Sequence, residues 1–294
     1  MGSLRGHIGP GLAFCIIGLW HLFNHTKLHA TNPNTYISHP WFPISKFRYL
    51  ELYFIIFAAS TSISMELFIM PHRHHPFAPD GSIPSNHLHN LEHATISLTF
   101  LTYASFAVVL DRISPPARSS LTHLLAALTL AQELLLFHLH STDHTGLEGR
   151  YHWLLQILIL TALGLTMISA ADSRSFLLSF ARSLAIFAQG VWLVVIGVML
   201  YTPRLMPKGC AVRVEDGHYV VRCGSGEAVE RAKSLATILF SYYVVGVAVF
   251  GVGVYLYLLK LYSKDQVEYH NLEDATGFGD HEEEEEVDAF HLDG

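Results

Sequence analysis

The chain has 294 residues, of which 51% are hydrophobic and only 15% charged, and its net charge at neutral pH is −7. Its mean hydropathy is +0.33. This composition excludes an ordinary soluble domain, in which roughly a quarter of the residues are charged. No nucleic-acid partner is expected for such an apolar, acidic chain.

Seven apolar runs are each long enough to cross a bilayer, which takes about 20 residues. They cover residues 8–24, 49–70, 93–110, 121–138, 151–171, 176–201 and 235–261. A chain of this size has too little polar exterior to bury seven helices that are apolar all round. We therefore predict an all-α membrane protein with seven transmembrane helices. The membrane domain is expected over residues 1–262, without a cleavable signal peptide.

Residues 209–226, between the last two runs, read "GCAVRVEDGHYVVRCGSG". Apolar and polar residues alternate around Asp216-Gly217, a dipeptide that favours a two-residue hairpin turn. Counting outward from the turn brings Cys210 opposite Cys223 on a non-hydrogen-bonded rung, where Cα atoms approach most closely. We predict a disulfide that closes this small β-hairpin, with two reduced cysteines in a loose loop as the alternative.

The orientation follows from charge and from the predicted disulfide. Seven spans place the two termini on opposite sides of the membrane. Outside the hairpin loop, most Lys and Arg residues flank the spans on the C-terminal side, which indicates the cytosol. The basic residues of the hairpin loop cancel this difference, but a structural disulfide belongs in an oxidising compartment. We therefore predict an exoplasmic N-terminus and hairpin and a cytosolic C-terminus, in the secretory pathway or plasma membrane.

The last 32 residues, 263–294, contain the run "DHEEEEEVDAF". Such an acidic run buries nothing, which predicts a disordered, solvated cytosolic tail. A docking role toward cytosolic partners is the alternative.

Twenty histidines outnumber the 18 Lys and Arg residues, and many fall at the predicted exoplasmic helix ends. Two carboxylates lie inside predicted spans, where an ionisable side chain is costly and marks a candidate functional site. Imidazole and carboxylate groups that converge from several helices at one level are typical metal ligands. The best ligand set is His93, Glu133, His140 and His152, with Glu66, His138 and His7 as further candidates.

Zinc fits this imidazole-rich set, and iron or copper bind similar ligands. A proton relay or pH sensor made of histidines and carboxylates is the main alternative. His89, Glu92 and His93 also spell H-x-x-E-H, the pattern of inverted zinc proteases, which a His-rich chain matches easily by chance. Further histidines near the cytosolic side, His21 and His25, suggest haem ligation as a minor alternative.

Several of these segments resemble the transmembrane protein 45 family, seven-span proteins of plants and animals. They are "MGSLRGHIGPG", the intramembrane Glu66 and Glu133, "FHLHSTDH" followed by "YHWLLQ", and "QGVW". The stretch "HSTDHTGLEGRYHWLLQ" is similar to the plant branch in particular. The resemblance runs from Met1 to about Leu261 and implies the seven-helix fold, but this family carries no settled activity. The chain is more loosely similar to the seven-span zinc amidohydrolases. It lacks the H-x-x-x-H of their last span, since its own last span contains no histidine.

Three functions follow from a His/Glu site on the exoplasmic side. In a hydrolase the metal activates water against an amide or ester of a membrane lipid, with Glu133, Glu66 or Asp143 as base. In a transporter the same ligands hold a metal ion or proton in transit, and polar groups continue toward the cytosol. The candidates for that continuation are Glu51, His21, His25 and His123. In a receptor-like or structural protein the metal joins helices without catalysis.

Overall fold

The computed structural model describes residues 4–69, 77–84, 87–143, 145–215 and 218–276, with side chains left aside at 140–143, 218 and 263–276. The helices are α1 (Leu4–Thr31), α2 (Leu50–Ser64), α3 (Leu88–Ile113), α4 (Arg118–Asp143), α5 (Gly146–Ala171), α6 (Phe176–Tyr201) and α7 (Gly226–Thr276). Each of these forms a segment long and apolar enough to cross a membrane, α2 together with the π-helical turn Met65–Ile69 that continues it. The seven-span prediction is therefore confirmed, and the protein is a multi-pass membrane protein.

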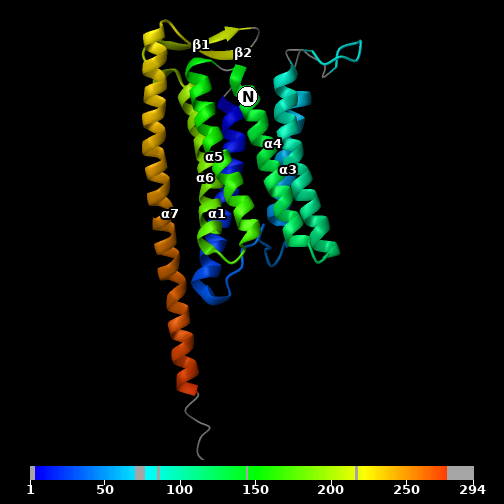
Figure 1. Ribbon diagram of the computed structural model, residues 1–294, viewed down its shortest axis with the longest axis vertical. Helices are drawn as coiled ribbons and strands as arrows, with labels where there is room; N and C mark the ends of the chain where they lie inside the picture. Colours follow the sequence, from blue (N-terminus) through cyan, green and yellow to red (C-terminus); the bar gives the residue numbers. More distant parts are fainter. Residues whose placement is uncertain (1–3, 70–76, 85–86, 144, 216–217, 277–294) are drawn as a thin grey trace, which may run out of the picture.

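The helices stand side by side and alternate in direction (Figure 1). α1 lies within the bundle against α6, whereas α7 runs along the outside and extends past one end of it. Residues 263–276, predicted to belong to the disordered tail, instead continue α7 as helix. Residues 277–294 lie outside the described residues, and their disorder remains a prediction. The strands β1 (Cys210–Glu215) and β2 (His218–Cys223) cross one end of the bundle, here called the hairpin end. The end that carries residues 32–49 is called the opposite end.

The hairpin forms in the predicted register. Cys210 pairs with Cys223, Val212 with Val221, and Glu215 with His218. The two cysteines form the disulfide. On one face of the hairpin Val221 is buried against α5, so the hairpin is anchored to the bundle as well as closed on itself.

Glycines allow α1 and α6 to approach until their backbones touch. Gly11 and Gly18 lie seven residues apart on α1, and Gly190 and Gly197 lie seven apart on α6. A Cβ on Gly190 would sit 2.5 Å from the backbone nitrogen of Cys15 and 2.6 Å from the carbonyl oxygen of Gly11. Such close contact between small residues is a common way for membrane helices to associate, because lipid provides no hydrophobic driving force between helices.

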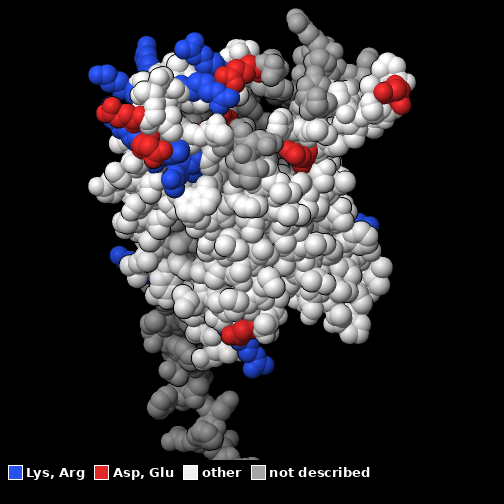
Figure 2. Space-filling model, turned by 45° about the horizontal axis from the view of Figure 1, so that its top comes forward, with Lys and Arg blue, Asp and Glu red and all other residues white. Residues whose placement is uncertain are grey.

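A broad band of the surface in Figure 2 carries almost no charge, while Lys and Arg gather at the hairpin end. Large apolar side chains in this band are exposed, among them Tyr242 and Val249 of α7. An apolar belt of this extent is expected of a surface that faces lipid tails.

Candidate functional site

The hairpin end contains a cluster of buried histidines and carboxylates. Glu66 lies on the π-helical turn Met65–Ile69 that extends α2, a rare conformation that often marks functional sites. Its Oε1 lies 3.6 Å from Nδ1 of His93 on α3, and its Oε2 accepts a hydrogen bond from Asn90 at 2.7 Å. His93 itself is only 3% exposed. The intramembrane Glu66 thus has a histidine neighbour, as expected from the sequence.

A second part of this hairpin-end cluster joins α1, α5 and α6. The rings of His7 and His152 lie 5.7 Å apart, and the ring of Tyr201 lies 5.6 Å from His7. His152 donates from Nδ1 to the backbone oxygen of Glu148 at 2.9 Å. That bond makes Nε2 the acceptor nitrogen of the neutral ring, the arrangement found in histidines that bind metals or relay protons.

Glu148 connects this cluster to the hairpin. Its Oε1 accepts a hydrogen bond from the hydroxyl of Tyr201 at 3.2 Å, and its Oε2 accepts one from the backbone N–H of Val221 at 3.5 Å. The carboxylate is 3% exposed. The sequence analysis did not include Glu148 among the site residues, although its place in "HSTDHTGLEGRYHWLLQ" beside the histidines was a usable signal.

The predicted ligands whose side chains are described lie beside several different partners. Among the described residues, no three His, Cys, Asp or Glu side chains are placed so that they could share one metal ion. His89 faces Glu92 at 3.5 Å and His93 faces Glu66, so the H-x-x-E-H residues turn to different partners. His138 contacts Gln156 at 3.0 Å. The side chain of His140 lies outside the described residues, and the predicted zinc site therefore remains a prediction.

Glu133 lies near the middle of α4 and is 1% exposed. Its Oε1 accepts a hydrogen bond from Nε2 of Gln189, near the middle of α6, at 2.6 Å. Its Oε2 and the side-chain oxygen of Gln189 have no hydrogen-bond partner in the described part of the chain. A buried polar atom without a partner is costly and calls for an explanation, such as a water, an ion or a proton.

The opposite end contains a separate polar cluster built around Glu51 at the start of α2. Its Oε1 lies 2.7 Å from Nε2 of His21, and its Oε2 accepts hydrogen bonds from Trp20 Nε1 at 3.0 Å and from the backbone N–H of Phe42 at 2.8 Å. Glu51 is 5% exposed. The carboxylate joins α1, α2 and the connection between them.

His25 and Arg182 form the second half of this opposite-end cluster. Nη2 of Arg182, on α6, lies 3.1 Å from Nε2 of His25 and donates to the backbone oxygen of His39 at 3.0 Å. Because a guanidinium only donates, His25 must accept through Nε2, carry its proton on Nδ1 and donate to the hydroxyl oxygen of Tyr36 at 2.8 Å. Protonation of His25 would therefore break its contact with Arg182.

Three other polar groups lie at this end, of which Tyr36 and His123 are buried and His39 is exposed. Partial desolvation lowers the pKa of His39 and burial raises the pKa of Tyr36, and both shifts favour the uncharged side chain at neutral pH. His123 contacts the backbone oxygen of Ser119 through Nδ1 at 2.9 Å, while its Nε2 has no partner among the described residues. The polar groups that the sequence predicted for this end, Glu51, His21, His25 and His123, are all buried inside the protein.

One comparison with known proteins bears on this arrangement. A family of unknown function, DUF716, matches residues 119–256. The match begins at the start of α4 and ends within α7, so it includes Glu133, Gln189 and the hairpin but not α1, α2 or α3. The transmembrane protein 45 proteins that the sequence resembles fall under the same description. The match shows similarity over these residues and, since the family has no assigned activity, transfers no function.

Proposed function

We propose that this protein moves protons across the membrane, with Glu133 as the intermediate site between the two polar clusters. The observation that carries the proposal is the buried Glu133 and Gln189 pair, in which one oxygen of each side chain has no partner among the described residues. Ionisable groups inside a membrane typically mark ion or proton pathways. The plant-type resemblance of the chain is consistent with this function but does not supply it.

The spacing along the helices gives the proposal its geometry. At a rise of about 1.5 Å per residue, Glu133 lies about 7.5 Å along α4 from His138 at the hairpin end and about 15 Å from His123 at the opposite end. On α6, Gln189 lies about 10 Å from Arg182 by the same rise. These distances are longer than one hydrogen bond, so the proposed proton path requires water molecules between the side chains.

The test uses the purified full chain in liposomes that contain a pH-sensitive dye, with a potassium gradient and valinomycin to drive proton entry. We expect wild type to acidify the interior and Glu133→Gln to reduce the rate about tenfold or more, because an amide cannot release a proton. Glu92→Gln is the matched control, since the side chain of Glu92 is 33% exposed and lies 3.5 Å from His89 rather than beside Glu133. Equal rates for wild type and Glu133→Gln would overturn the proposal.

A metal site at the hairpin end is the second candidate, favoured by the burial of three histidines and two carboxylates from α1, α3, α5 and the π-helical turn after α2. The buried side chains whose chemistry suits a metal are His7, His93, His152 and Glu66, and they would have to move closer together to share one ion. Zinc is the preferred ion of such a set, and iron or copper would use the same ligands. A hydrolase that acts on a membrane lipid would require this metal site. Haem binding would require histidine pairs that face each other.

Plasma mass spectrometry of the detergent-purified protein tests the metal directly. A zinc content near one per chain that is lost in His93→Ala, but kept in His89→Ala, would support the site. His89 is the matched control because its ring is 40% exposed and faces Glu92. A folded wild-type protein that holds no zinc after incubation with zinc would contradict this candidate and leave the proton pathway intact.

A further inference from the structure

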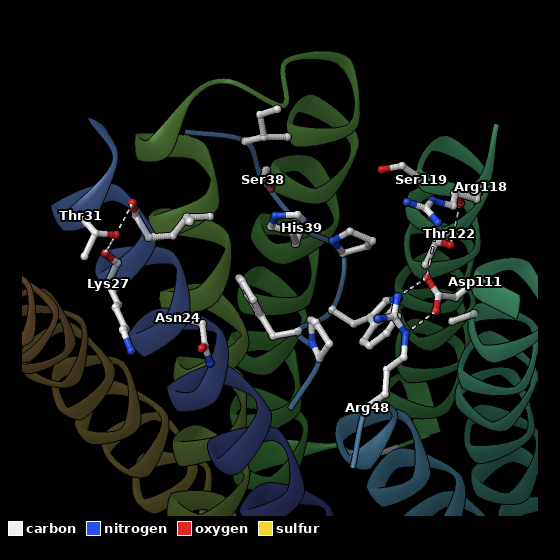
Figure 3. Close-up of a pocket in the computed structure, with 17 residues that line it drawn as sticks. Asn24, Lys27, Thr31, Ser38, His39, Arg48, Asp111, Arg118, Ser119 and Thr122 are labelled. Carbon is white, nitrogen blue, oxygen red and sulfur yellow. Dashed lines mark hydrogen bonds and ion pairs between the residues drawn. The ribbon is translucent and has the colours of Figure 1, made fainter. Parts of the chain in front are cut away.

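A pocket of about 620 Å³ opens at the opposite end of the bundle (Figure 3). The last turns of α1, the connection between α1 and α2, the end of α3 and the start of α4 form its walls. Its volume lies in the usual range of small-molecule sites, about 300–1,000 Å³. The pocket is separate from Glu133 and from the hairpin-end cluster, and an inference about it does not depend on the proposed function.

The pocket combines an apolar wall with a positively charged rim. Trp41 and Phe42 line the wall and are themselves largely buried. On the rim, Arg48 donates to Asp111 at 2.8 Å, and Arg118 lies 3.8 Å from the other oxygen of the same carboxylate. Figure 3 shows these three side chains together on one side of the pocket.

Counting charges on the lining leaves a positive excess. Lys27, Arg48 and Arg118 carry three positive charges against the one negative charge of Asp111, which leaves two with His39 neutral. Lys27 lies on the other side of the pocket, with its Nζ 5.0 Å above the ring of Tyr262. Because Arg48 and Arg118 share one carboxylate, each guanidinium group keeps N–H groups that can donate hydrogen bonds to a further anion.

A buried cation lies behind the same pocket. Arg182 is 3% exposed, and its Nη2 donates a hydrogen bond to the backbone oxygen of His39. In the described part of the chain, no ion pair joins the guanidinium group of Arg182 to a carboxylate. Glu51, the carboxylate of this cluster, is already occupied by three donors. Removing a charge from water without a counter-ion is costly, so an anion beside His39 would offset part of that cost.

We propose that this pocket binds the phosphate group of an anionic phospholipid, with the acyl chains following the apolar wall into the bilayer. The pocket lies where membrane-spanning helices end, and the adjoining surface is apolar, with Phe47 67% and Leu50 47% exposed. Basic pockets between transmembrane helices are typical binding sites for phospholipid head groups. A soluble phosphate has the same head-group chemistry but leaves the apolar wall unused.

The experiment uses the full chain in nanodiscs of a zwitterionic lipid. Phosphatidic acid is titrated in one arm and inorganic phosphate in the other, and tryptophan fluorescence reports binding because Trp41 lines the pocket. We expect phosphatidic acid to bind and the double variant Arg48→Gln with Arg118→Gln to weaken it at least tenfold. The matched control is Arg112→Gln with Arg174→Gln, which removes two basic residues that do not line the pocket.

Three results would overturn the proposal. They are equal binding by wild type and the Arg48/Arg118 variant, equal weakening by the control variant, or inorganic phosphate binding as tightly as phosphatidic acid. If the double variant does not fold, Ser119→Trp fills the pocket from its α4 wall without removing charge. Loss of phosphatidic acid binding in Ser119→Trp supports the proposal, and unchanged binding contradicts it.

Discussion

Two buried glutamates of this protein have opposite surroundings. Glu51 accepts hydrogen bonds from two side chains and a backbone N–H, so its charge is compensated within the fold. Glu133 accepts one hydrogen bond, from Gln189, and its second oxygen has no partner among the described residues. A carboxylate whose oxygens all accept hydrogen bonds can be explained by a structural role, since it joins the segments that donate to it. A carboxylate in the middle of a membrane helix with one oxygen unpartnered has no such structural explanation. This difference is why the proposed function centres on Glu133.

At the same scale, the sequence indicated which polar residues would be buried better than it indicated their partners. Glu66 beside a histidine was expected from the cost of a carboxylate inside a span, and Glu66 and His93 do face each other. Arg182 and Gln189 were missed, although a charged or amide side chain within a predicted span is the same signal. Partners could not be predicted because the side chains come from different helices, and only their packing sets which pairs meet.

Among the elements, the contact between α1 and α6 is the one most sensitive to substitution. We expect Gly190→Ala to destabilise the protein by about 3 kcal/mol, since the added methyl group would meet backbone atoms of α1 that cannot move aside. Thermal unfolding in detergent, followed by tryptophan fluorescence, measures the change. Gly246→Ala on α7 is the matched control, because a Cβ there meets nothing within 4 Å. Equal melting temperatures for the two variants would show that the helices are not packed backbone to backbone.

The elements themselves were largely predictable, and their contacts were not. Apolar runs and the Asp216-Gly217 turn act locally, so the seven helices and the hairpin register follow from short stretches of sequence. Helix α3 begins at Leu88, five residues before the predicted span, because its first turns are polar and extend past the apolar run. The glycine spacing of seven on α1 and α6 gained meaning only when the structure placed these two helices in contact.

For the whole molecule, the two ends of the bundle carry different chemistry. The hairpin end has the disulfide, a buried histidine and carboxylate cluster, and a surface rich in Lys and Arg. The opposite end has the Glu51 and Arg182 clusters and the basic pocket. Because basic residues flank both ends, charge alone does not orient this protein in the membrane. The disulfide favours the orientation with the hairpin outside, since disulfides form and persist in oxidising compartments.

We therefore expect the hairpin to face outward and the basic pocket to face the cytosol. In intact cells that make Cys15→Ser, an impermeant reductant followed by an impermeant maleimide should label Cys210 and Cys223, seen as a mass shift. The comparison is a chain without native cysteines that carries Arg174→Cys, an exposed position in the connection between α5 and α6 at the opposite end. It should react only after the membrane is permeabilised. Labelling of Arg174→Cys in intact cells, with the hairpin protected, would reverse the orientation and place the pocket for phosphatidic acid in the outer leaflet.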